Sequence, residues 1–438
     1  MKKCTALLLA LLAALSLTAC GQTEDTGDTE WEYPAAFAGL ETLVEQAQAE
    51  GSLTVYGGCP ADYLTAACET FEELFDIRVS YQEVSDRAVL DKLSKPGRPG
   101  ADVWFGADSG ALEEAAAIGG LTAYVPAAAA GLTDGDFAGA DGLWYGVAVN
   151  PLGLMVNTAS LKEMEIGAPS GWDDLTKLEY WELLWLPGYD TAEGRLLAQA
   201  ALDTYDSKAE KYLLALDENT VRYTEDGDPA AKYVGTGECV VAVGLLDRGA
   251  AQRLENGYDD IRLVMPDEGT PYVLHGAAIL RGAGHSAAAQ LWMEFVLSPT
   301  GQALMAESGW YVWPTVEGVS LPEAFTQLNV DLSGLTCRLP MGEDAETLDA
   351  LIEAVFNTPV PQPAAEQKKS FEALLTTSLG DDCSLDVVQT VHDQLCQRIE
   401  LHKESKVPEP LMISKEDVKE VLTSCGVSQE HLAKFSVD

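Results

Sequence analysis

The sequence predicts an α/β protein of two lobes joined by two hinge crossings, followed by a mainly helical C-terminal segment. Between residues 52 and 307, short apolar runs alternate with stretches of helical periodicity, which favours sheets covered by helices. Two long extended apolar runs, at 146–156 and 272–280, divide this alternation into two blocks and are expected to cross between the lobes. From Thr336 onward the chain holds no Trp or Tyr and only three of its 39 Gly, which marks a second unit.

The first twenty residues are typical of a secretory signal peptide. Two lysines precede an apolar run at 6–17, which is shorter than the roughly 20 residues that a membrane-spanning helix needs. The segment ends in Leu-Thr-Ala-Cys and resembles a bacterial lipobox, in which Cys20 is acylated and becomes the mature N-terminus. An ordinary signal peptide with an incidental cysteine is the alternative. Residues 21–30 are polar and acidic, so we expect 21–35 to be a solvated tether.

Charge and cysteine content narrow the class of protein further. The formal net charge of -43 argues against nucleic acid and against anionic lipid surfaces as partners, because both require clusters of Lys and Arg. The nine cysteines give no disulfide framework. Cys59 and Cys68 are close in sequence, but a helix of that length would hold them about 13 Å apart, too far for a disulfide. We therefore expect mostly free, buried thiols.

The first block of the body, which we place at 36–335 overall, is expected to form lobe 1. Lobe 1 would comprise about 51–148 and the returning chain at 273–330. Strand–helix–strand repeats of this length favour a mostly parallel sheet with helices on both faces. In order, the expected elements are a strand at 53–56, a helix from Pro60, a strand at 77–81, a helix opened by residues 85–87, a strand at 101–106 and a helix capped by Asp108 and Ser109.

The second block is expected to form lobe 2, at about 149–272. The predicted hinge comprises residues 147–150 and 273–276. In order, the expected elements are strands or helices at 183–186, 191–205, 220–223, 240–243 and 261–265, followed by two helices of the returning chain at 287–296 and 301–307.

Six short segments, in order between residues 51 and 314, carry a resemblance to a known family. They are Leu-Thr-Val-Tyr-Gly-Gly at 53–58, Gly-Ala-Asp-Val-Trp-Phe-Gly at 100–106, Gly-Leu-Trp-Tyr-Gly at 142–146 with its continuation to 158, Ser-Gly-Trp-Asp-Asp-Leu at 170–175, Pro-Asp-Glu-Gly-Thr-Pro-Tyr at 266–272 and Phe-Val-Leu-Ser-Pro-Thr-Gly at 295–301. Together they resemble extracellular solute-binding proteins of ABC importers, in the subgroup that serves ferric iron, thiamine, phosphonates and sugar phosphates. The resemblance implies a periplasmic-binding-protein-like fold of type 2, whose lobes close on a ligand.

Ligands of open α/β sheets bind beyond the carboxyl ends of strands, near helix N-termini, where free amides favour anionic groups. Arg87 and Arg248 each follow a strand, one in each lobe, and an Arg there can clamp a phosphate or carboxylate; a surface ion pair is the alternative for each. The candidate ligand-binding residues are Tyr56, Gly57, Gly58, Ser85, Arg87, Asp108, Ser109, Asn150, Tyr189, Thr191, Tyr223, Asp247 and Arg248.

The nature of the cargo follows from what the sequence contains. Ferric-binding members of the resembled group commonly use adjacent tyrosines with a His and a carboxylate, but this sequence has no Tyr-Tyr pair, and its body holds only His275 and His285. We therefore expect no metal site and no cofactor, and a small anion or an organic phosphate or carboxylate as cargo, with an iron complex as an open alternative.

An enzymatic alternative rests on Cys59. It precedes Pro60 near a helix N-terminus, an environment that can lower a thiol pKa and create a nucleophile. The same two-lobed fold hosts a thiamin-cleaving enzyme with a cysteine nucleophile. However, no histidine is placed near Cys59 in the sequence, and no catalytic motif accompanies it. We expect no catalytic residues and no enzyme activity.

Residues 336–438 are expected to form a helical tail of unknown role. Residues 345–356 are amphipathic, and the stretch from about 366 to 435 resembles the C-terminal end of an uncharacterised bacterial family of unknown function. Such a tail has two explanations, a real fusion or a reading frame that joins two unrelated genes.

These observations together predict a substrate-binding receptor, lipid-anchored on the extracellular face of the bacterial cytoplasmic membrane. Its partners would be a small-molecule solute and an ABC permease, with no nucleic acid. A solute sensor that serves a membrane kinase is the alternative binding function.

Overall fold

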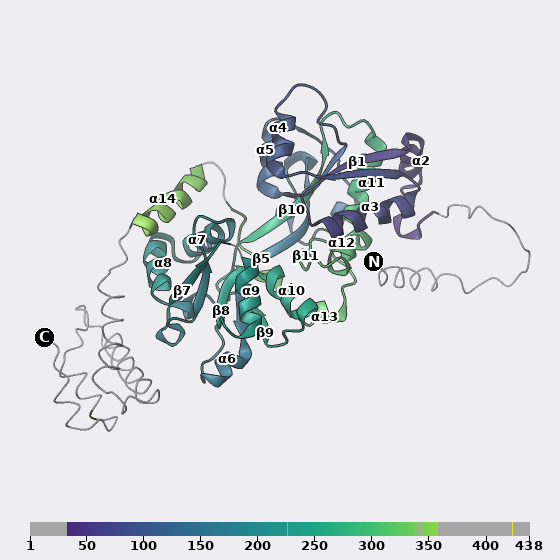
Figure 1. Ribbon diagram of the computed structural model, residues 1–438. Coiled ribbons are helices and arrows are strands. Elements are labelled where there is room, and N and C mark those ends of the chain that lie inside the picture. The colour runs from purple at the N-terminus through teal and green to yellow at the C-terminus, as the bar shows by residue number, and fades with distance from the viewer. Residues whose placement is uncertain (1–32, 226, 340–342, 358–422, 424–438) are drawn as a thin grey trace, which may run out of the picture.

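The computed structural model describes residues 33–225, 227–339, 343–357 and 423, which form two lobes connected by extended strands (Figure 1). The predicted signal peptide, Cys20, most of the tether and most of the tail lie outside the described residues. Within the described part of the chain, no helix combines the length and apolarity that crossing a membrane requires.

Lobe 1 is built from three parallel strands in the order β2-β1-β3, covered by helices. A short strand, β4, pairs with β10 (Tyr272–Leu280). The elements of lobe 1 are α2 (Glu41–Glu50), β1 (Ser52–Gly57), α3 (Ala61–Phe75), β2 (Arg78–Glu83), α4 (Asp86–Leu93), β3 (Val103–Asp108), α5 (Ser109–Ala117) and β4 (Leu121–Thr122). The chain later returns to add α11 (Ser286–Val296) and α12 (Pro299–Glu307).

The core of lobe 1 explains why α3 and α11 form where they do. Helix α3 buries an apolar stripe that includes Phe71, and it is capped at its C-terminus by Asp76, whose φ of 53° is left-handed. Trp292 of α11 is fully buried, and its ring centroid lies 5.2 Å from those of both Phe71 and Phe105. The returning chain therefore packs into the core of lobe 1.

Lobe 2 contains the parallel strands β8, β6 and β7 in that order, with β9 paired to the crossing strand β5. Its elements are α6 (Thr158–Glu163), β6 (Leu184–Pro187), α7 (Ala192–Tyr205), α8 (Ala209–Glu218), β7 (Thr220–Thr224), α9 (Gly227–Thr236), β8 (Val241–Leu245), α10 (Leu246–Asn256) and β9 (Ile261–Val264).

The two crossings are the strands β5 (Tyr145–Asn157) and β10 (Tyr272–Leu280), which pair antiparallel at the centre of the molecule (Figure 1). Val273 lies opposite Asn150, and His275 lies opposite Ala148, so the two predicted hinge segments are neighbours. The N-terminal part of β5 pairs with β10 and its C-terminal part with β8 and β9, so this strand passes from one lobe to the other.

The prediction of a mostly parallel sheet is correct for β1–β3 of lobe 1 and for β6–β8 of lobe 2, but not for the crossing strands. Every antiparallel pairing between described strands involves β5 or β10. Strand β10 enters lobe 1 antiparallel to β3, and β5 enters lobe 2 antiparallel to β8.

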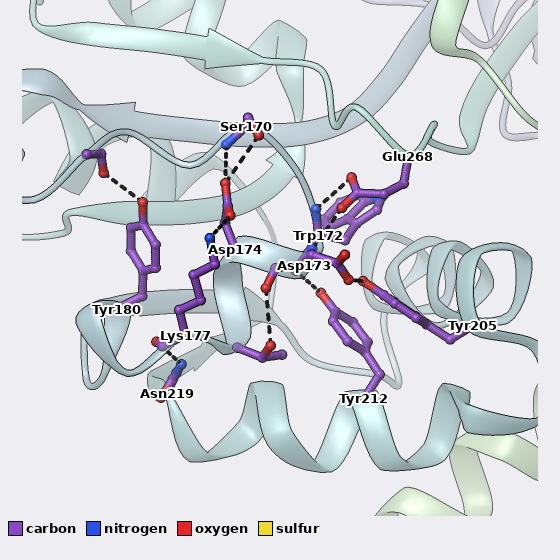
Figure 2. A network of polar contacts seen from close by, with 12 residues as sticks. Ser170, Trp172, Asp173, Asp174, Lys177, Tyr180, Tyr205, Tyr212, Asn219 and Glu268 are labelled. Carbon is purple, nitrogen blue, oxygen red and sulfur yellow. Dashed lines mark hydrogen bonds and ion pairs between the residues drawn. The ribbon is translucent and has the colours of Figure 1, made fainter. Parts of the chain in front are cut away.

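Two segments that carry the family resemblance hold each other in place within lobe 2 (Figure 2). The carboxylate of Glu268 accepts hydrogen bonds from the amides of Trp172 and Asp173, each at 2.9 Å, and the Trp172 indole donates to the Gly269 carbonyl at 2.8 Å. A Cβ on Gly171 would lie 2.0 Å from a Glu268 carboxylate oxygen, so only glycine allows this approach. These residues are therefore structural.

The chain beyond residue 311 packs on both lobes. Strand β11 (Trp313–Pro314) pairs with β5, and Phe325 of α13 (Glu323–Thr326) contacts Trp313 at 5.4 Å between ring centroids. Helix α14 (Glu343–Asn357), close to the predicted 345–356, lies against α7 and α8 of lobe 2 (Figure 1). The boundary at 335 stays a prediction, and residues on both sides of it contact lobe 2.

Candidate functional site

A cleft of about 930 Å³ lies between the lobes, next to the crossing strands. Lobe 1 and the returning chain contribute Gly58, Cys59, Pro60, Asp108, Trp310 and Tyr311; the crossing strands contribute Asn150, Val273 and His275; lobe 2 contributes Ala192, Lys232, Tyr233, Asp247, Arg248, Gln252 and Glu255. Its walls thus come from segments that are more than 200 residues apart in the chain.

Helix N-termini from both lobes open on this cleft. Helix α3 begins directly after Pro60, α7 begins at Ala192, and α10 begins after Leu245, and all three of these residues line the cleft. The first amides of a helix have no partner within the helix and carry a partial positive charge. The arrangement therefore favours an anionic group of a ligand.

Two cationic side chains of lobe 2 strengthen this preference. Arg248 lies in the first turn of α10, its side chain is 37% exposed, and its Nε lies 3.6 Å from the Asp247 carboxylate. The Asp247 amide donates to the Asn150 side-chain oxygen at 3.3 Å, which ties the start of α10 to the hinge. Lys232 of α9 is exposed at the edge of the same cleft.

His275 lies on the hinge strand β10, where its backbone faces Asp108. Its ring contacts Trp310 edge to face, with 5.1 Å between centroids. Burial lowers the pKa of His275, the Asp108 carboxylate opposes that shift, and Arg248 adds to it. The imidazole is therefore mainly neutral at pH 7, so it offers the cleft a hydrogen-bonding group and not a charge.

The loop that carries Gly58 and Cys59 packs closely against Gly106 of β3. Gly106 has a φ of 71°, and a Cβ there would lie 2.5 Å from the Cys59 Cβ. The Asp86 carboxylate lies next to Gly58 and accepts a hydrogen bond from the Asp108 amide at 3.1 Å. Burial raises the pKa of Asp86 to about 6, and the negative charge of Asp108 contributes in the same direction.

We expect the Asp86→Asn variant to lose part of the pH dependence of stability. Because the folded-state pKa lies above the unfolded value, the folded protein binds the proton more tightly, and the free energy of unfolding falls as pH rises from about 4 to about 6. Asparagine keeps an oxygen for the Asp108 amide and removes the charge. Urea midpoints at pH 4 to 7 should fall less steeply for the variant than for the wild type, and equal slopes would contradict this assignment.

The structure brings five of the sequence-predicted ligand residues together in the cleft, namely Gly58, Asp108, Asn150, Asp247 and Arg248. The others are not among the residues that line it. Arg87 is 77% exposed and pairs with Asp91 at 3.2 Å, as its surface alternative predicts. Tyr56 is buried and donates to the Pro99 carbonyl, and Gly57 faces Leu64.

The remaining predicted residues have local roles. Ser85 precedes α4, Ser109 is buried at the start of α5, and Thr191 caps α7 by accepting from the Gly194 amide at 3.0 Å. Tyr189 and Tyr223 contact each other, with 6.0 Å between ring centroids.

Several cleft residues were not predicted. Gln252 and Glu255 follow Arg248 at helical spacing on α10, so extending the predicted site along that helix face would have found them. Trp310 and Tyr311 lie after α12, far in sequence from the other walls, and no sequence pattern marks them.

The cysteine environment differs from the one that the enzymatic alternative requires. Cys59 is buried, and burial raises its pKa to about 12 where a helix N-terminus was expected to lower it. His275 does line the same cleft, which the sequence did not indicate. Within the described residues Cys59, Cys68, Cys239 and Cys337 are all free thiols, and the first three are buried, as predicted. No group of three metal-ligating side chains is assembled in the described ranges.

Comparison with known proteins assigns the family. The model for bacterial extracellular solute-binding proteins matches residues 53–311, more than half of the chain. The chain belongs to this family. The model for a domain of unknown function, DUF4317, matches residues 323–437, in agreement with the predicted resemblance of the tail.

Two relatives of this solute-binding protein are similar to it in sequence, and one of them is itself a periplasmic binding protein. The periplasmic binding protein AfuA from Actinobacillus pleuropneumoniae, solved with exogenous fructose-6-phosphate bound, is 28% identical, with 69% of this chain and 97% of AfuA covered and a TM-score of 0.53. An uncharacterized protein of Haemophilus influenzae is 30% identical over 287 residues, covering 60% of this chain and 78% of that protein.

A third comparison shows the fold alone. Ferric iron-binding protein A of Mannheimia haemolytica, in an open conformation, has a TM-score of 0.59 at 18% identity, with 71% of this chain and 99% of that chain covered. The predicted two-lobed, periplasmic-binding-protein-like fold is thereby confirmed.

Proposed function

We propose that this solute-binding protein is the lipid-anchored receptor of an ABC importer and that it captures a small solute bearing a phosphate or carboxylate group. The observation that carries the proposal is the cleft between the lobes, where Arg248, Lys232 and three helix N-termini converge. Closure of the lobes would surround the anionic group with amides and the Arg248 guanidinium.

The cargo we favour is a phosphate ester or carboxylate with a hydroxylated body. Asp108, Asp247 and Asn150 supply oxygen acceptors on the same cleft, which suit hydroxyl groups and do not suit a bare oxyanion. The cleft volume of about 930 Å³ also exceeds what a single phosphate fills. The relative AfuA, which carries a sugar phosphate, supports the same class.

Ferric iron receives less support as a directly bound cargo. The sequence lacks a Tyr-Tyr pair, and the tyrosines of the cleft are Tyr233 and Tyr311 from different lobes. An iron complex with an organic acid would present carboxylates to the same amides and is included in the test.

Lipid anchoring through Cys20 and delivery to a permease complete the proposal. A Cys20→Ser substitution should release the protein from the membrane fraction. The competing binding function, a sensor for a membrane kinase, would predict a kinase gene beside this one in place of permease genes.

A thermal-shift screen of the full chain tests the cargo. The panel comprises inorganic phosphate, phosphonates, sugar phosphates, thiamine, carboxylates, polyamines and ferric citrate. We expect a dose-dependent rise in melting temperature with a phosphate ester or carboxylate, because a ligand that binds only the folded state stabilises it by mass action. A rise with polyamines alone, or turnover of any compound, would overturn the proposal.

A further inference from the structure

A short segment after the returning chain follows the hinge on the face opposite the cleft. Val273 and His275 of β10 line the cleft. Because side chains alternate along a strand, Tyr272 and Leu274 point to the other face, where Leu335 packs against the apolar cluster that contains them. We call residues 332–338 the back strap.

The backbone of the back strap is bonded to the start of the second crossing. The Thr270 amide donates to the Gly334 carbonyl at 2.9 Å, the Thr336 amide donates to the Thr270 carbonyl at 2.9 Å, and the Tyr272 amide donates to the Cys337 carbonyl at 3.0 Å. The strap begins with a short 3-10 helix (Leu332–Gly334), and the chain after it runs beside residues 270–272, directly before the hinge segment of β10.

Two residues near the C-terminal end of the back strap contact lobe 2. The hydroxyl of Thr336 and the thiol of Cys337 each lie 3.1 Å from a carboxylate oxygen of Asp203 on α7. Further along, α14 packs on α7 and α8 through buried residues that include Leu348, and Asp349 pairs with Arg195 of α7 at 2.7 Å. The described chain before residue 340 and after residue 342 thus contacts the same lobe.

The tip of the back strap contacts lobe 1. The Arg338 guanidinium lies 3.6 Å from the Glu113 carboxylate on α5 and 5.3 Å from the centre of the Trp144 ring. Helix α5 lies in one lobe and α7 with α14 in the other (Figure 1). Arg338 is therefore a link from a segment bonded to lobe 2 across to lobe 1.

We propose that the back strap sets the resting opening of the cleft and thereby the apparent affinity for the solute. The hinge lies between the cleft and the strap, so a rotation that closes the cleft moves Glu113 of lobe 1 away from Asp203 of lobe 2 and from the strap residues bonded to it. The Arg338 contacts oppose this rotation and stabilise the present arrangement of the lobes against further closure. The affinity part of this inference rests on the proposed function; the effect on lobe opening does not.

The test measures lobe separation and binding in the full chain. Click-reactive non-canonical amino acids replace Asp62 and Thr236, exposed residues that lie two and three positions after the cleft residues Pro60 and Tyr233, and they carry spin labels while every cysteine stays untouched. Without ligand, Arg338→Ala and Glu113→Gln should each shift the inter-label distances toward shorter values. An exposed ion pair and a cation–π contact are weak individually, so the apparent Kd for fructose 6-phosphate should fall by about threefold to tenfold.

A matched control is Arg281→Ala, because Arg281 bonds the carbonyls of Gly119 and Leu93 within lobe 1 alone. It should leave the ligand-free distances unchanged. The charge-swapped pair Arg338→Glu with Glu113→Arg should restore the wild-type distances, which a merely structural role would not produce. Unchanged ligand-free distances in both Arg338→Ala and Glu113→Gln would overturn the proposal. Failure to bind fructose 6-phosphate with shifted distances would count against that cargo only.

Discussion

Replacing Arg248 with alanine is expected to weaken solute binding at least about 30-fold, equivalent to about 2 kcal/mol. The guanidinium lies in the first turn of α10 at the wall of the cleft, where its charge adds to that of the helix N-terminus. Removing it leaves the solute's anionic group with the helix amides and with Lys232 at the edge of the cleft. Isothermal titration calorimetry measures the change in Kd directly, with the compound that raises the melting temperature in the thermal-shift screen.

Arg87→Ala is the matched control for this experiment. Both arginines follow a strand of their lobe, and the sequence offered both as ligand-binding residues, but Arg87 is 77% exposed and paired with Asp91. Its loss should alter the Kd less than twofold. Equal effects of the two substitutions would mean that long-range attraction, and not contact in the cleft, carries the binding.

Much of the fold could be predicted because its signals are local. The apolar stripe of α3, the Asp108 cap of α5 and the Thr191 cap of α7 each depend only on residues that are close to one another in the sequence. The two crossings were visible because a strand that is buried along its whole length, as β5 is, leaves a long apolar run.

The candidate site could be predicted only in part, because its walls meet through the hinge. Asp247 and Arg248 lie where a strand ends and a helix begins, which the sequence indicates. Trp310 and Tyr311 reach the cleft through the packing of the returning chain, and the burial that raises the Cys59 pKa comes from neighbours such as Gly106. No short sequence pattern indicates that Trp310 and Tyr311 reach the cleft or that Cys59 is buried.

The start of α7 shows how a close backbone approach shapes one wall of the cleft. Thr191 precedes the helix, donates its hydroxyl to the Gly188 carbonyl at 2.7 Å and accepts from the Gly194 amide. The loop at 188–191 therefore folds back on the first turn of the helix. Ala192, the first helical residue, lines the cleft directly.

Gly194→Ala is expected to destabilise lobe 2 by about 3 kcal/mol. A Cβ at this position would lie 2.0 Å from the Gly188 carbonyl oxygen and 2.7 Å from the Tyr189 Cα, and because both atoms belong to the backbone the loop itself has to move. A loss of this size should lower the melting temperature of lobe 2 by roughly 6–12 °C. Calorimetry of the full chain would resolve the transition.

Gly167→Ala is the control, because a Cβ there would meet no atom within 4 Å and the residue lies in the same lobe. If Gly194→Ala melted like Gly167→Ala, the loop at 188–191 would be free to shift, and the α7 N-terminus would not be a fixed wall of the cleft. If it melts lower and also loses solute binding, the same close approach that stabilises lobe 2 also holds the α7 amides toward the ligand. Stability and binding would then depend on one glycine for one geometric reason.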